Sequence, residues 1–167
     1  RLMKTFAPGL TIYAVDSKGI VNSQSVLNGP KEKLIADGII ATDKTGDLAV
    51  ALAGADIFVG VSQPDVVKPA MVASMNQDAI IFAMANPVPE IMPDVALKAG
   101  ARVVATGRSD FANQINNSLG FPGIFRGALD HKVQNITSAM LIKAAKNLAA
   151  CVAKPTATNI IPSTFDK

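Results

Sequence analysis

Amide, hydroxyl and guanidinium side chains are concentrated in residues 107–118, directly after an apolar run at 101–105. Arg108 presents a planar fork that suits a carboxylate or a phosphate. The adjacent amides of Asn116 and Asn117 can hydrogen-bond a carboxylate without adding charge. Polar density just past a buried strand is typical of the ligand site of an open α/β sheet. The segment therefore predicts a small-molecule site, and a loop joined by amide hydrogen bonds is the alternative.

A second polar position follows the preceding apolar run, residues 79–84. Asn86 stands there before a Pro-Val-Pro segment, and the prolines restrict the backbone and leave its amide to donate to a carboxylate or carboxamide. An Asx-Pro turn without a ligand is the alternative. We interpret Glu90, at the end of this segment, as a cap or a surface acid and not as a catalyst.

Three more residues lie where apolar runs end. An acid such as Asp16, at the end of the first visible strand, can accept hydrogen bonds from an adenosine ribose and favours a free 2′-hydroxyl over a 2′-phosphate. It can equally open a turn that ends at Gly19. Gly60 would let a dinucleotide approach the backbone, and Ser62 could bond a ribose or phosphate or serve only a turn.

The elements that must position these residues alternate along the chain. The apolar runs are continuous, as expected for strands covered on both faces, and cover residues 10–15, 57–61, 79–84 and 101–105. Helical patterns separate them, at residues 30–36, 47–52, 68–75 and 94–99. This alternation predicts right-handed crossovers, a parallel sheet and hence an α/β, Rossmann-type doubly wound domain.

The ends of the chain add two expectations. Residues 136–152 have apolar residues at helical spacing, so we expect a long C-terminal packing helix and divide the chain into 1–134, a partial Rossmann domain, and 135–167, a helix and tail. No Gly-x-Gly-x-x-Gly string occurs. We therefore expect the first strand and the glycine-rich loop to be lacking, and the chain to be the C-terminal part of a longer polypeptide.

Composition excludes several classes of function. The 167 residues are 49% hydrophobic and 17% charged, which favours a well-buried globular domain over disorder. The net charge of +3 comes from scattered Lys and Arg, so nucleic-acid binding is not expected. No signal peptide is recognisable and no apolar run reaches membrane-spanning length, which predicts a cytoplasmic location and no membrane partner. Cys151, the single cysteine, follows an apolar helical pattern, so we expect it to be a small buried side chain.

Three strings in order resemble the cofactor domain of bacterial malic enzymes: ANPVPE at 85–90, ATGRSDFANQINNS at 105–118 and FPGIFRGALD at 121–130. The resemblance extends from about residue 9 to residue 163. It implies oxidative decarboxylation of L-malate to pyruvate and CO₂ with reduction of NAD or NADP, by a homodimer or higher homo-oligomer that uses Mn²⁺ or Mg²⁺. It also implies that the catalytic lysine, the catalytic tyrosine and the metal ligands lie upstream, so none is assigned to this chain.

The resemblance and the strand ends together give the predicted site. Substrate binding is predicted for Asn86, Asn116 and Asn117. Cofactor binding is predicted for Asp16, Gly60, Ser62, Asn86, Arg108 and Asn117. Two alternatives stay open: a non-catalytic nicotinamide-binding regulatory module, and a malolactic-type enzyme that retains its cofactor and releases lactate.

Overall fold

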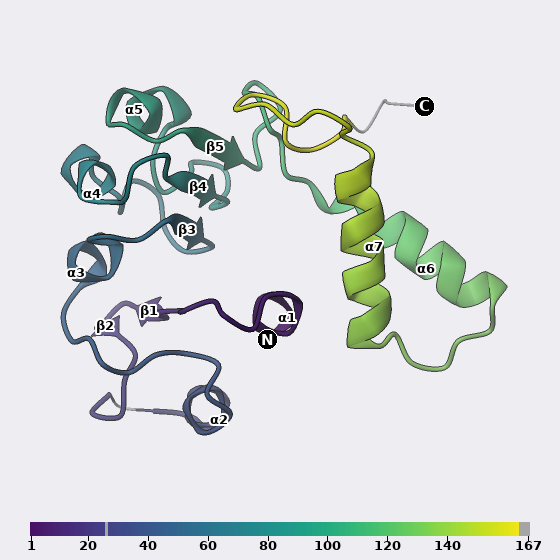
Figure 1. Cartoon of the computed structure of the whole chain (residues 1–167), viewed down its shortest axis with the longest axis horizontal. Helices are drawn as coiled ribbons and strands as arrows, with labels where there is room; N and C mark the ends of the chain where they lie inside the picture. Colours follow the sequence, from purple (N-terminus) through teal and green to yellow (C-terminus); the bar gives the residue numbers. More distant parts are fainter. Residues whose placement is uncertain (26, 164–167) are drawn as a thin grey trace. The chain divides into compact units, whose positions relative to one another are not determined.

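The computed structural model describes residues 1–25 and 27–163. The chain forms two compact units, Arg1–Ala55 and Asp56–Lys167 (Figure 1). This division differs from the boundary predicted at residues 134 and 135, which stays a prediction.

The first unit contains short helices and one small hairpin. Its elements are α1 (Leu2–Phe6), β1 (Val15–Asp16), β2 (Gly19–Ile20), α2 (Gly29–Ala36) and α3 (Leu48–Leu52). Two helices begin where a polar side chain satisfies a free backbone N–H. Asn28 accepts from the Lys31 amide at 3.2 Å, and Asp47 accepts from the Val50 amide at 3.1 Å.

The strand expected over residues 10–15 is wrong in extent. Only Val15 of that run is in a strand, and β1 pairs antiparallel with β2. The rest of the run makes single backbone bonds to loops and no ladder. The Ile12 carbonyl accepts from the Ala41 amide and the Ala14 carbonyl from the Val21 amide, both at 2.8 Å. Apolar composition favours extended backbone, but a strand also needs a paired neighbour.

The second unit is built on a parallel sheet of three strands in the order β3 (Ile57–Gly60), β4 (Ile80–Ala83), β5 (Val103–Thr106). Helix α4 (Pro69–Ala73) connects β3 to β4, and α5 (Pro93–Lys98) connects β4 to β5. The three arrowheads point the same way in Figure 1, with α4 and α5 side by side. This arrangement confirms the predicted α/β class and its parallel sheet.

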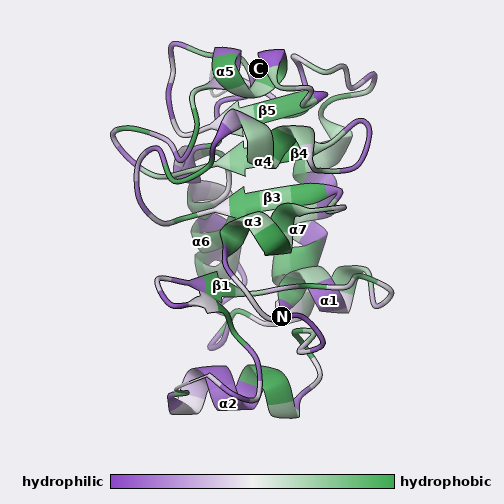
Figure 2. Ribbon diagram, turned by 90° about the vertical axis from the view of Figure 1, so that its left-hand side faces the viewer, coloured by the Kyte–Doolittle hydropathy of each residue, from purple (hydrophilic) through white to green (hydrophobic). Residues whose placement is uncertain are grey.

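Burial differs between the strands of this sheet. All four residues of β5 are buried, as predicted for a strand covered on both faces. In β3 only alternate residues are buried, and Ile57 and Val59 are 46% and 43% exposed. The prediction of burial on both faces is therefore wrong for β3. Figure 2 shows the hydrophobic colouring of the strands.

Three helical elements follow the sheet: η1 (Asn117–Leu119), α6 (Phe121–Asp130) and α7 (Ser138–Ala150). The last confirms the long helix expected over residues 136–152, and Thr137 caps it by accepting from the Met140 amide at 3.4 Å. Cys151 follows α7 and is exposed, so the expected burial of this cysteine is wrong. Among the described helices, none has the length and apolar character needed to cross a membrane.

Candidate functional site at the strand ends

The three parallel strands end side by side. Gly60 is paired with Ala83, and Ala83 with Thr106, so the segments that follow all begin at one edge of the sheet. Ser62 follows β3, Asn86 follows β4, and the polar segment 107–118 follows β5. The carboxyl edge of an open parallel sheet is where ligands bind in this architecture.

Asn86 and Gly107 are in contact across two of these ends. A Cβ atom added at Gly107 would lie 3.2 Å from Asn86 Nδ2 and 3.3 Å from Oδ1, so the absence of a side chain at 107 makes room for the amide. Asn86 is exposed, and its peptide bond to Pro87 is cis. The structure thus brings the Asn86 amide to the start of the segment that contains the other predicted site residues.

The predicted asparagine pair lies next to the same edge. Residue Gln114 forms a parallel bridge with Thr106, and the Ile115 amide donates to the Thr106 carbonyl at 2.8 Å. Asn116 and Asn117 follow immediately. The loop therefore returns to the end of β5 and starts η1 there.

The two asparagines of the pair differ in what their side chains do. Asn116 is the N-cap of η1, and its Oδ1 accepts from the Ser118 amide at 3.0 Å. Asn117 is exposed, and its side-chain amide makes no hydrogen bond within residues 1–25 and 27–163. The geometry favours Asn117 as the ligand-binding member, and the substrate role of both stays a prediction.

Arg108 is already engaged by a neighbour. Its Nε donates to Asp110 Oδ1 at 2.8 Å, its Nη2 donates to Oδ2 at 2.6 Å, and the guanidinium lies 5.4 Å from the centre of the Phe111 ring. This bidentate pair lowers the pKa of Asp110 from its usual value, chiefly through the Arg108 hydrogen bonds. The predicted phosphate or carboxylate contact would require the guanidinium to exchange or share this partner.

Asn113 serves the fold, a role that the sequence reasoning did not assign. It is 7% exposed, its φ is +57°, and its Nδ2 donates to the carbonyls of Val104 at 3.0 Å and Ala157 at 2.8 Å. Its Oδ1 accepts from the Ile160 amide at 3.0 Å. This one amide fastens the segment at 157–160 to the end of the sheet. The sequence signal that could have predicted this role is an Asn in a loop with few glycines, because Asn tolerates positive φ better than most residues.

Glu90 is buried, so its interpretation as a cap or surface acid is wrong. It is 0% exposed, and its carboxylate accepts from the Ser62 amide at 2.7 Å and the Ala85 amide at 3.0 Å. A Cβ at Gly60 would lie 2.5 Å from Glu90 Cδ, so this glycine makes room for the acid. The predicted cofactor contacts of Gly60 and Ser62 stay predictions.

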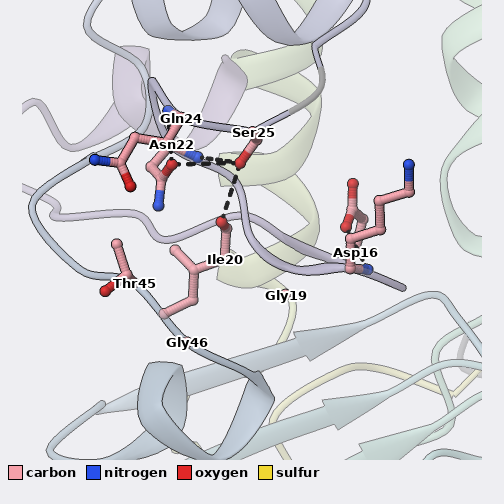
Figure 3. Close-up of a pocket in the computed structure, with 9 residues that line it drawn as sticks. Asp16, Gly19, Ile20, Asn22, Gln24, Ser25, Thr45 and Gly46 are labelled. Atoms are coloured by element: carbon pink, nitrogen blue, oxygen red, sulfur yellow. Dashed lines mark hydrogen bonds between the residues drawn. The ribbon is translucent and has the colours of Figure 1, made fainter.

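Asp16 lines a cavity of about 320 Å³ in the first unit, together with Gly19, Asn22, Thr45 and Gly46 among others (Figure 3). The position is compatible with both interpretations, the turn and the ribose contact. Its Oδ1 accepts from the Lys18 amide at 2.7 Å, as in a turn, while its carboxylate still reaches an open cavity.

The cation that faces Asp16 is Lys31, which sequence reasoning missed. The Lys31 ammonium forms an ion pair with Asp16 Oδ2, and this hydrogen bond is the main cause that lowers the pKa of Asp16 from its usual value of 3.8. The two residues are 15 positions apart, and no local pattern in the sequence joins them. The ion pair therefore places a cation beside the ionised carboxylate that lines the cavity.

The described residues do not supply a metal centre. Within residues 1–25 and 27–163, no group of three or more His, Cys, Asp or Glu side chains could hold a metal ion. The Mn²⁺ or Mg²⁺ implied by the resemblance therefore does not fit a ligand set in this part of the chain.

A parallel sheet with connecting helices and polar side chains at its carboxyl edge defines a Rossmann-like α/β domain. Comparison with known families gives a match over residues 9–165 to the model described as malic enzyme, NAD binding domain. The chain belongs to this family.

Individual relatives agree with the family. The chain is 46% identical over 160 residues to a bifunctional malic/malolactic enzyme of Bacillus subtilis and 45% identical over 157 residues to an NAD-dependent malic enzyme of Geobacillus stearothermophilus. These matches cover 93% of this chain but only 39% and 33% of the two relatives. The crystal structure of an NAD-dependent malic enzyme from Thermotoga maritima is 45% identical with a TM-score of 0.84, over 93% of this chain and 41% of that one.

Proposed function

We propose that this chain supplies the cofactor and substrate contacts for oxidative decarboxylation of L-malate to pyruvate and CO₂, coupled to reduction of NAD or NADP. The observation that carries the proposal is the edge where Asn86, lying against Gly107, and the exposed amide of Asn117 follow neighbouring strands. Uncharged amides at such an edge suit a dicarboxylate that must bind beside a nicotinamide.

Three of the predicted residues have a stated task in this proposal. Asn86 donates to the substrate carboxylate or the nicotinamide carboxamide, and Asn117 donates to the substrate. Asp16, beside its cavity, accepts from the adenosine ribose of the cofactor. The bound nicotinamide supplies a hydride acceptor. The proton-transfer residues and the metal ligands come from outside the described residues, among which no cluster of metal-binding side chains is found.

The direct test mixes the intact protein with L-malate and Mn²⁺, with NAD or NADP in separate runs, and follows reduced nicotinamide and pyruvate together. We expect both products to appear in equal amounts, and the better cofactor identifies the preference. Cofactor binding without either product would contradict the proposal and favour a regulatory nicotinamide-binding module.

A second candidate is a malolactic activity, because the Bacillus subtilis relative carries both activities in its name. Lactate would then accumulate from malate without net formation of reduced nicotinamide. Chromatography of the same reaction mixtures distinguishes lactate from pyruvate. We retain the oxidative reaction as the first proposal because the other named relatives are malic enzymes.

We further propose a cytoplasmic protein that forms a homodimer or higher homo-oligomer. Three apolar side chains exposed on α6 support self-association: Phe121, Phe125 and Leu129 are 51%, 54% and 75% exposed. Light scattering of the purified intact protein measures its mass, and a monomer at micromolar concentration would contradict the oligomer.

A further inference from the structure

One buried carboxylate has no task in the function proposed above. Glu90 is fully buried, in the segment that leads from β4 to α5. Among the described residues, no lysine, arginine or histidine forms an ion pair with it. A carboxylate without a cation stays buried only when several hydrogen-bond donors replace water, because its desolvation is expensive.

Those donors come from the ends of two different strands. Glu90 Oε1 accepts from the Ser62 amide at 2.7 Å and from the Ser62 hydroxyl at 3.4 Å, beyond the end of β3. Oε2 accepts from the Ala85 amide at 3.0 Å, beyond the end of β4. Hydrogen bonds to a charged acceptor are about twice as strong as neutral ones. One side chain thus joins the two strand ends at the sheet edge.

The surrounding backbone fixes Glu90 itself. The Asp65 amide donates to the Pro89 carbonyl at 3.1 Å, and the Val67 amide donates to the Glu90 carbonyl at 3.0 Å. The missing side chain at Gly60 leaves the space that the carboxylate fills. The backbone at positions 89 and 90 is therefore fixed by the segment at 65–67, so the carboxylate can impose a fixed geometry on the amides that it binds.

The residue next to Ala85 is Asn86, whose amide lies against Gly107. We propose that Glu90 is a positioning residue for the reaction: it holds the Ala85 and Ser62 amides and so sets the placement of the Asn86 side chain that binds substrate. This proposal rests on the proposed function. Displacing a binding group by about 1 Å can reduce catalytic efficiency about a hundredfold, so a positioning residue need not touch the substrate.

The test compares Glu90→Gln with Ile81→Val in the intact protein. The glutamine keeps the shape but turns one acceptor into a donor that faces a backbone N–H. Ile81 is 0% exposed in the centre of β4, so its valine variant is a matched control that weakens the same strand without touching the site. Each variant is measured for thermal midpoint, kcat and KM for malate, and amide hydrogen exchange over residues 60–64 and 84–87.

We expect Glu90→Gln to lower kcat/KM for malate about tenfold or more, mainly through KM, and to speed exchange of the Ser62 and Ala85 amides. Ile81→Val should lower the thermal midpoint while its malate kinetics stay within about twofold of the wild type. Malate kinetics of Glu90→Gln that match the wild type, or that change only as Ile81→Val does at the same loss of thermal midpoint, would overturn the proposal.

Two further outcomes remain decisive. If Glu90→Gln does not fold, Glu90→Asp keeps the charge and shortens the reach, and the same comparison with Ile81→Val applies. If the wild type itself converts no malate, the proposed function fails, and the positioning proposal, which rests on it, fails with it. If the wild type is active and Glu90→Gln leaves exchange at the Ser62 and Ala85 amides unchanged, the positioning proposal alone is overturned.

Discussion

In the polar segment after β5, some side chains stabilise the fold and others are available to bind a ligand. Both ends of the Asn113 amide bind backbone groups and Asn116 Oδ1 caps η1, while the exposed Asn117 side chain has no such bond among the described residues. The same residue type thus has different roles at positions only a few residues apart. An amide that the fold does not use is the one available to a ligand.

We expect Asn117→Ala to raise KM for malate about 10- to 100-fold, because a hydrogen bond to a charged ligand contributes about 1.5–3 kcal/mol. The dissociation constant of the cofactor should change less than about threefold, because most of its contacts lie elsewhere. Steady-state kinetics and a nicotinamide fluorescence titration measure the two quantities. Asn147→Ala, at an exposed asparagine of α7, is the control. Unchanged malate kinetics in Asn117→Ala would remove its substrate role.

Removing Asp16 and removing Lys31 should shift the preference between NAD and NADP in opposite directions. Asp16→Ala leaves the Lys31 ammonium unpaired beside the cavity, so the ratio of kcat/KM with NAD to that with NADP should fall about tenfold. Lys31→Met leaves the carboxylate unopposed, and the ratio should rise. Parallel kinetics with both cofactors measure the ratio. An identical ratio in the wild type and both variants would show that Asp16 has only a structural role in its turn.

At the scale of elements, Asn113 joins the end of β5 to the segment at 157–160. Asn113→Ala should lower the free energy of unfolding by about 2 kcal/mol or more, because it leaves buried backbone groups unpaired and adds strain at positive φ. Asn113→Gly is the control that removes the hydrogen bonds but tolerates the φ of +57°. Urea denaturation of both variants separates the cost of the lost hydrogen bonds from the cost of backbone strain. Equal stability of Asn113→Ala and the wild type would contradict the role.

The elements of the second unit were predictable because each strand is a short apolar run between helices with Pro or acid near their starts. The run at residues 10–15 failed because composition does not reveal whether a neighbouring strand is present. Glu90 was misjudged because a charged residue in a proline-rich segment usually lies in water. The partners of Asp16 and Asn113 come from 15 and 44 residues away, and no local pattern encodes such contacts.

At the scale of the whole molecule, the pH dependence of stability includes a contribution from Asp16. Its pKa is lowered in the folded state, so folding releases protons and this stabilisation is present above about pH 4 and is lost as pH falls through the folded pKa. Asp16→Asn should therefore be less stable than the wild type at pH 7, and the difference should shrink toward about pH 3. Urea denaturation across this range measures it. Lys31→Met should also lose the pH-dependent stabilisation that the ion pair gives. A stability difference between wild type and variant that grew as the pH fell would contradict the role of Asp16.

The close packing around Gly60 also limits which positions can change independently during descent. A Cβ added at position 60 would lie 2.5 Å from Glu90 Cδ and 2.8 Å from Phe58 Cε1, so a larger residue there needs both neighbours to give way. Lineages that carry a larger residue at position 60 should therefore also differ at positions 58 and 90. Substitution of Gly60 alone should therefore be rare among relatives that keep both Phe58 and Glu90.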